Sequence, residues 1–222
     1  MIKQAINFFL LAVVFVACKS STENSSRVEV LPYYGEATFT PKWYSTIEEI
    51  PQGFHRIPEF NLLNQNGKKI TEKEVEGQIY VADFFFTSCP GICPKLTSNM
   101  SLVQNEFLED DEILLMSHSV TPNYDSVSVL QKYAMTKGVM TGKWHLLTGD
   151  RDHIYELGRN AYFAEESLGQ KKGIDDFLHT ENFILVDKNR YIRGIYNGLN
   201  KSSVNQLIVD IKTLKRSESS LH

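Results

Sequence analysis

The sequence predicts an α/β domain built on a mixed sheet, and three observations support that prediction. Residues 78–86 form a nearly continuous apolar run, which is typical of a strand buried on both faces. Downstream, segments with helical apolar spacing alternate with short apolar strands, as in the βα units of a parallel sheet. Two strands joined by a short turn and one amphipathic helix complete the chain, which adds an antiparallel hairpin to the parallel units.

The first expected elements surround the buried strand. Residues 60–63 and 69–70 flank Asn66-Gly67, a dipeptide that strongly favours a tight hairpin turn. Residues 87–94, rich in proline and glycine, end the strand, and a helix should follow them. Four apolar residues recur there at helical intervals of three and four positions: Leu96, Met100, Val103 and Phe107.

The alternation of strands and helices continues toward the C-terminus. The expected strands are 113–120, 144–148, 183–186 and 191–196, and the expected helices are 124–137, 150–162 and 203–215. The last two strands form a hairpin across the turn at 187–190. Together these elements predict a central mixed sheet flanked by helices.

Composition excludes several classes of protein. Of the 222 residues, 42% are hydrophobic and 23% are charged, which is typical of a globular domain and not of a disordered chain. The net charge is −4, and removing residues 1–17 takes away only Lys3, leaving 22 basic against 27 acidic residues, or −5. An acidic body of this kind argues against non-specific nucleic-acid binding. Three cysteines are too few for a disulfide-stabilised scaffold.

Residues 1–17 have the pattern of an export signal. Lys3 precedes an apolar stretch that ends at Ala17 and is much shorter than the roughly 20 apolar residues of a transmembrane helix. The stretch runs into Phe15-Val16-Ala17-Cys18, which is similar to a bacterial lipobox. Cys18 is therefore expected to carry a lipid and to become the first mature residue. The alternative is an ordinary cleaved signal with an incidental cysteine.

The rest of the chain divides into four further segments. Residues 18–30 are polar and low in complexity, which predicts a flexible tether. Residues 31–57 contain several prolines and aromatic residues and are expected to lie extended over the domain surface. The α/β domain spans residues 58–217, and residues 218–222 form a C-terminal tail. With the lipid anchor, this monomeric domain is placed in the cell envelope, on the periplasmic or extracytoplasmic side of a bacterial membrane.

Two cysteines lie where a parallel sheet places its chemistry. Cys89 and Cys93 follow the buried strand and lead into a helix, so they are expected at the carboxyl end of a strand. A helix N-terminus lowers the pKa of a thiol and favours the thiolate. Two residues four apart can also turn their sulfurs to one face of the first helical turn. Such a pair can form a disulfide or hold a soft metal ion such as Cu(I).

A histidine helps to decide between these two chemistries. All seven prolines lie at or before Pro122, so the C-terminal part of the chain lacks the cis-proline that faces the dithiol in thioredoxin-like disulfide exchangers. His179 stands in the corresponding stretch, just before the second hairpin. Two thiolates and one imidazole make a three-coordinate site suited to a soft metal.

These residues carry a resemblance to a known family. The segment 86–94, Phe-Thr-Ser-Cys-Pro-Gly-Ile-Cys-Pro, together with His179 before residues 183–187, resembles the Sco/SenC proteins over roughly residues 55–216. The resemblance implies a thioredoxin-like fold that binds copper through Cys89, Cys93 and His179. It also implies that the partner is subunit II of cytochrome c oxidase, to whose dinuclear copper site such proteins deliver copper or electrons.

The chain departs from the family pattern at one position near the site. Residues 119–125 match a stretch that the family often writes S-x-D-P-x-x-D, with Thr121 in place of the first aspartate and Asp125 as the second. Two further polar residues occupy expected strands. His118 is a fourth ligand, a residue that supports a ligand, or a solvated strand-end residue, and Asp83 either supports the site or is a partnered acid of the core.

Two classes of function follow from the same dithiol. The first is a non-enzymatic copper metallochaperone needed for maturation of the dinuclear copper site. The second is a membrane-tethered thiol-disulfide oxidoreductase that reduces the cysteines of that site or of another exported protein. His179 in place of proline favours the metallochaperone. In either case Cys89 and Cys93 are expected to form a disulfide on oxidation.

Overall fold

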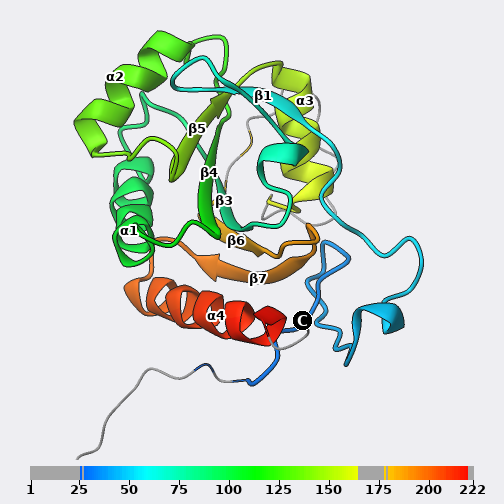
Figure 1. Ribbon diagram of the computed structural model, residues 1–222. Coiled ribbons are helices and arrows are strands. Elements are labelled where there is room, and N and C mark those ends of the chain that lie inside the picture. Colours follow the sequence, from blue (N-terminus) through cyan, green and yellow to red (C-terminus); the bar gives the residue numbers. More distant parts are fainter. Residues whose placement is uncertain (1–25, 27, 165–177, 179, 220–222) are drawn as a thin grey trace, which may run out of the picture.

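The computed structural model of the protein describes residues 26, 28–164, 178 and 180–219. One seven-stranded sheet runs through this part of the chain, with helices on both of its faces (Figure 1). The strands are β1 (Asn61–Asn64), β2 (Lys69–Thr71), β3 (Ile79–Phe85), β4 (Ile113–Ser119), β5 (Trp144–Thr148), β6 (Asn182–Val186) and β7 (Ile192–Asn197). The helices are α1 (Cys93–Glu106), α2 (Val127–Lys137), α3 (Arg151–Glu156) and α4 (Lys201–Ser219), with the short helical segments η1 (Ile47–Glu49), η2 (Glu72–Glu74) and η3 (Leu157–Ala161).

The order of strands across the sheet is β2-β1-β5-β4-β3-β6-β7. Strands β3, β4 and β5 run parallel to one another, and every other neighbouring pair is antiparallel. All residues of β3 and β4 are buried, as the apolar run at residues 78–86 predicts for a central strand. The mixed sheet confirms the predicted fold class.

Different helices cover the two faces of the sheet. Helices α1, α2 and α4 pack on one face, called here the α1 face, where Met100, Leu130 and Leu207 are buried. Helix α3 and η3 pack on the opposite α3 face. Side chains alternate between the faces along a strand, so the neighbouring Phe84 and Phe85 belong to opposite cores. No helix in the described part of the chain is long and apolar enough to cross a bilayer.

Helix boundaries differ from the sequence prediction at three places. Helix α2 begins at Val127 rather than at residue 124, because Ser126 before it has extended backbone angles. The expected helix at 150–162 is not regular, since α3 passes into the π-helical η3. Helix α4 extends the expected helix at 203–215 by two residues at its start and four at its end.

The segment before β1 crosses the edge of the sheet. The Tyr34 N–H donates to the carbonyl oxygen of Ile192 in β7 at 3.0 Å. Arg193 holds the same segment, because its Nε donates to the carbonyl oxygen of Pro32 at 3.0 Å. The Nη1 of Arg193 also pairs with the buried Asp187 carboxylate at 2.9 Å. This buried ion pair holds Arg193, whose hydrogen bond to Pro32 fastens the N-terminal segment to β7.

Candidate functional site

The two cysteines lie on a short loop between the central strand and the first long helix. Strand β3 ends at Phe85, and α1 begins at Cys93 with Pro94 in its first turn, where a missing N–H costs nothing. Both cysteines are free thiols; Cys93 is buried on the α1 face, and Cys89 is partly exposed. The structure therefore places the dithiol at the carboxyl end of a parallel strand, as the sequence predicts.

The two thiols differ in their electrostatics. Burial raises the pKa of Cys89, but hydrogen bonds from the backbone and thiol of Cys93 and from the N–H groups of Gly91 and Ile92 outweigh it and lower the pKa below its ordinary value. Burial is also the main reason why the pKa of Cys93 rises to about 12, and the Cys89 thiolate adds to this rise. Cys89 is thus the more exposed thiol and the one that ionises more readily, and Cys93 is the buried thiol that donates a hydrogen bond to it.

This asymmetry predicts unequal rates of thiol alkylation. In a Cys18→Ser background that leaves only the dithiol, iodoacetamide at neutral pH should modify Cys89 first. Cys93 should react more than about tenfold more slowly, because alkylation requires an accessible thiolate. Peptide mass spectrometry over time measures both rates. Equal rates, or faster labelling of Cys93, would contradict the assignment.

Asp125 joins the cysteine loop to the end of β4. Its buried carboxylate accepts hydrogen bonds from the N–H of Thr87 at 3.2 Å and from the Thr87 hydroxyl at 2.5 Å. The hydroxyls of Ser119 and Thr121 donate to the same carboxylate at 2.6 and 3.0 Å. Thr121 stands where the Sco/SenC pattern has its first aspartate, and its hydroxyl therefore donates to Asp125, the second aspartate of that pattern. The sequence marks Asp125 by its place in the motif, but nothing in it indicates that Thr87 and Ser119 are its partners.

Asp83 is a partnered acid on the same face of the sheet as Cys93. The hydroxyl of Ser117 donates to its carboxyl group and in turn accepts from the indole N–H of Trp144 at 2.8 Å. Burial raises the pKa of Asp83 to about 7, and the Ser117 hydrogen bond offsets part of that rise. A negative charge on Asp83 would raise the pKa of Cys93 further.

His118 lies on the other side of the sheet. Its ring stacks on Phe84 with the centroids 4.9 Å apart, and Tyr162 contacts it from the side. The Nδ1–H donates to the carbonyl oxygen of Asp83 at 3.3 Å, whereas Nε2 is buried and has no partner among the described residues. Because Cys93 is on the α1 face and this ring is on the α3 face, the geometry favours a packing role for His118 over a role as fourth ligand.

The burial of His118 predicts a pH dependence of stability. Burial lowers its pKa to about 4, below the ordinary value of about 6.5, so the unfolded chain binds the extra proton more readily. The stability of the fold should fall as pH drops from about 6.5 to about 4, by on the order of 3 kcal/mol. Urea unfolding of the parent and of His118→Phe at several pH values tests this. The difference between the two curves isolates His118, because Asp83 titrates in both proteins, and parallel curves would contradict the prediction.

Two residues of the predicted site, His179 and Cys18, lie outside the described residues. The neighbours of His179 that are described, Leu178 and Thr180, are both buried, and the Thr180 hydroxyl accepts from the N–H of Asn182 at 3.0 Å. Within the described part of the chain, no three His, Cys, Asp or Glu side chains are grouped so as to hold a metal. Of the three predicted ligands, the structure describes Cys89 and Cys93.

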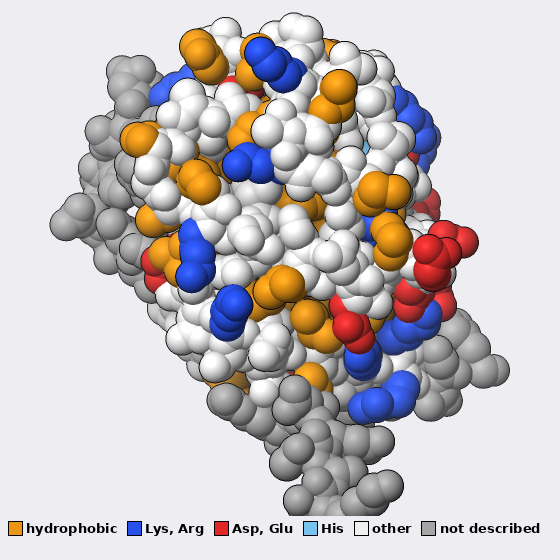
Figure 2. Space-filling model, turned by 90° about the vertical axis from the view of Figure 1, so that its left-hand side faces the viewer, with side chains coloured by type: hydrophobic (Ala, Val, Ile, Leu, Met, Phe, Trp, Pro, Cys, Tyr) orange, Lys and Arg blue, Asp and Glu red, His pale blue; other side chains and the backbone are white. Residues whose placement is uncertain are grey.

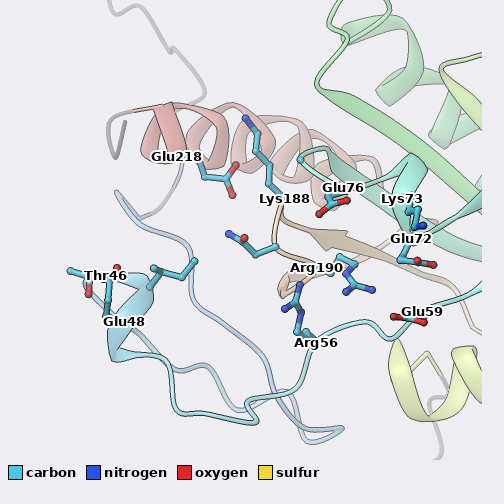
Figure 3. A pocket seen from close by; sticks show the side chains of 13 residues that line it. Thr46, Glu48, Arg56, Glu59, Glu72, Lys73, Glu76, Lys188, Arg190 and Glu218 are labelled. Atoms are coloured by element: carbon cyan, nitrogen blue, oxygen red, sulfur yellow. The ribbon is translucent and has the colours of Figure 1, made fainter.

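A charged cavity of about 860 Å³ lies at the opposite end of β3 from the dithiol (Figure 3). Arg56, Arg190 and Lys188 line it together with several glutamates, among them Glu218. Gly77, just before the start of β3, also borders the cavity, whereas the cysteines follow the end of that strand. The cavity is therefore separate from the dithiol site.

Comparison with known proteins gives a consistent result. The model of the SCO1/SenC family matches residues 49–216. The chain is 29% identical over 161 residues to the SCO1 protein homolog of Bacillus subtilis, which covers 72% of this chain and 82% of that protein.

Solved structures show the same likeness. A SCO1/SenC family lipoprotein from Bacillus anthracis superposes with a TM-score of 0.63 at 29% identity, over 72% of this chain and 95% of that one. BsSco is described as a member of the Sco family of cytochrome c oxidase assembly proteins. It superposes with a TM-score of 0.60 at 26% identity, over 72% of this chain and 93% of that one. Copper-bound ScoI of Bradyrhizobium japonicum superposes with a TM-score of 0.56 at 24% identity, over 71% of this chain and 98% of that one. At this identity the likeness supports the fold alone. These likenesses confirm the thioredoxin-like fold, and the family match across most of the domain shows that this chain belongs to the SCO1/SenC family.

Proposed function

We propose that this protein is a copper metallochaperone for the assembly of cytochrome c oxidase, in which Cys89, Cys93 and His179 bind the ion. The observation that carries the proposal is the pair of free thiols with opposite pKa shifts at the start of α1. Thiolate sulfur is the ligand type that selects Cu(I), and the lowered pKa of Cys89 makes one thiolate easier to form. BsSco, which is described as a member of a family of oxidase assembly proteins, supports the same function.

Copper binding would also deprotonate the buried Cys93. A metal ion is held by the deprotonated form of a cysteine, so binding would release the Cys93 proton despite its high pKa. The sulfur of Cys93 lies within hydrogen-bond reach of the Phe86 N–H as well as of Cys89, which favours the thiolate once the ion is present. Imidazole from His179 would complete a site with three ligands.

The surface beside the dithiol indicates what kind of partner it meets. Residues 87–105 and 126–143, which include α1 up to Asn105 and all of α2, contain three exposed lysines (Lys95, Lys132 and Lys137) and no acidic residue, although the whole chain carries a net charge of −4. Figure 2 shows the side of the molecule that is on the left in Figure 1, with Lys and Arg side chains spread among apolar patches and most acidic side chains near its right-hand edge. Such a surface suits a client with an acidic face, because complementary charge speeds and orients docking.

The partly exposed Cys89, with its lowered pKa, also supports the second candidate, a thiol-disulfide oxidoreductase. In that reaction Cys89 would attack a client disulfide, and Cys93 would then displace the client sulfur. The client would gain two electrons and two thiol groups, and this protein would be left with a Cys89–Cys93 disulfide. BsSco is described as having a disulfide switch.

A copper titration of the reduced protein, compared with its turnover as a disulfide reductase, separates the two functions. In a Cys18→Ser background, competition with a Cu(I) chelator should show one tightly bound ion per chain, and prior oxidation of the dithiol should abolish it. The matched variants Cys89→Ser and Cys93→Ser should each lose binding. Rapid reduction of a model disulfide without measurable copper binding would instead establish the oxidoreductase.

The same proposal places the domain outside the cytoplasm, attached to a membrane by a lipid on Cys18. The lipobox-like residues 15–18 support this, and so does the description of the Bacillus anthracis relative as a lipoprotein. Mass spectrometry of the mature N-terminus tests it directly.

A further inference from the structure

Exposed apolar side chains gather at the start of the described chain. Val28, Val30 and Trp43 expose 37%, 45% and 57% of their surface, so each leaves a large share of its apolar area in contact with water. Val28 and Trp43, together with Pro41, line one surface hollow of about 510 Å³ beside the first turns of α4. In Figure 1 this part of the chain runs along α4, on the side of the molecule away from α2.

These side chains are held on the folded domain. The hydroxyl of Ser26 donates to Asp210 of α4 at 2.6 Å, and the Nη2 of Arg193 donates to the carbonyl oxygen of Leu31 at 2.6 Å. Tyr33 and Lys42 exchange two backbone hydrogen bonds of 2.8 and 3.0 Å, which fix the backbone next to Trp43. The apolar surface therefore has a set orientation relative to the sheet and the dithiol.

The anchor confines this surface to the neighbourhood of the bilayer. Ser26 follows Cys18 by eight positions, and a fully extended chain spans about 28 Å over eight positions. This step rests on the lipid anchor of the proposed function. With the anchor in place, contact between the surface and the membrane is an intramolecular event, so a small apolar area is enough to favour it.

We propose that Val28, Pro41 and Trp43 lie against the lipid surface and set the orientation of the domain on the membrane. Tryptophan prefers the boundary between headgroups and acyl chains, where its ring is apolar and its N–H can be hydrogen-bonded. The part of α4 that borders the hollow adds mainly uncharged polar side chains: Ser202, Ser203 and Gln206. Its one acid, Asp210, is buried and already accepts hydrogen bonds from Tyr196 and Gln206, so its carboxylate keeps these donors when lipid covers the surface.

The chain offers a direct optical test, because it contains only two tryptophans. Trp144 is 1% exposed in the core, whereas Trp43 is 57% exposed. The full-length, processed protein is reconstituted into phosphatidylglycerol–phosphatidylethanolamine vesicles, with and without brominated acyl chains. Brominated lipid should quench the emission of Trp43 and leave that of Trp144. In Trp43→Phe the quenching should disappear.

A matched control places the probe on a different surface. Tyr124 is 64% exposed in the loop before α2, so Tyr124→Trp in the Trp43→Phe background should emit without quenching by brominated lipid. A protein that floats with the vesicles while Trp43 stays unquenched and open to iodide would overturn the proposal and leave the anchor intact. Protection of Trp43 from iodide without quenching by lipid would overturn it in favour of a protein partner or a second copy. Failure to float, with an unmodified Cys18, would overturn the anchor and the proposal together.

Discussion

Replacing His179 with alanine should weaken Cu(I) binding by more than about 100-fold, since losing even a group behind a metal ligand commonly costs about 10–100-fold. Two sulfurs alone would leave the ion open to solvent and to competing chelators. The sequence places His179 in a loop before the second hairpin, so we expect a change in unfolding free energy of about 0.5 kcal/mol or less. The Cys89–Cys93 disulfide should still form on oxidation. Chelator competition and urea unfolding measure the two effects.

The same variant separates the two candidate functions in cells. A metallochaperone that lacks its imidazole ligand should give little oxidase activity at limiting copper and partial recovery at excess copper. An oxidoreductase should keep most of its activity in both conditions. His153→Ala is the matched control, because that histidine lies on α3, on the other face of the sheet from Cys93. Full oxidase activity of His179→Ala at limiting copper would show that the ligand assignment or the chaperone function is wrong.

Asp125→Ala should be the most destabilising change at the site. The carboxylate is fully buried and accepts four hydrogen bonds from Thr87, Ser119 and Thr121. Its removal leaves these donors without a buried acceptor, and losing one member of such a buried network costs about 3–5 kcal/mol. The loop that carries Cys89 would also lose its link to β4, so copper affinity should fall as well.

Urea unfolding at neutral pH and copper titration of the folded fraction test this prediction. Asp150→Ala is the matched control, because Asp150 caps α3 through one exposed hydrogen bond to the N–H of His153. The loss of such a cap costs about 1 kcal/mol and should leave copper binding unchanged. A loss of less than about 1 kcal/mol in Asp125→Ala would mean that the network does not hold the loop.

Most of the fold could be predicted because its signals are local. The apolar run of β3, the Asn66-Gly67 turn and the alternation of helix and strand each appear within about a dozen residues, and the structure confirms them. The dithiol could be placed for the same reason, since it directly follows the most buried strand. The break between α3 and η3 could not be predicted, because residues 150–162 keep a helical pattern throughout.

The parts of the site that depend on long-range pairing could not be predicted. Which face His118 occupies follows from the register that sets it opposite Phe84 in β3, and a shift by one residue would exchange the faces. Thr87 and Asp125 are 38 positions apart in the chain and meet only because β3 and β4 are neighbours. The role of Asp83 could not be predicted for the same reason, since its partner Ser117 lies on the adjacent strand.

The ion pair between Arg193 and Asp187 also bears on self-association. A strand at the edge of a sheet presents unpaired N–H and C=O groups that can recruit another chain. At the β7 edge, the N–H of Tyr34 already donates to the carbonyl oxygen of Ile192. Arg193 keeps the segment that contains Tyr34 in place through its hydrogen bond to Pro32. The opposite edge, β2, is only three residues long and carries the exposed Lys69. Removing the guanidinium with Arg193→Leu would therefore free one edge for intermolecular pairing, and the first sign would be aggregation on refolding.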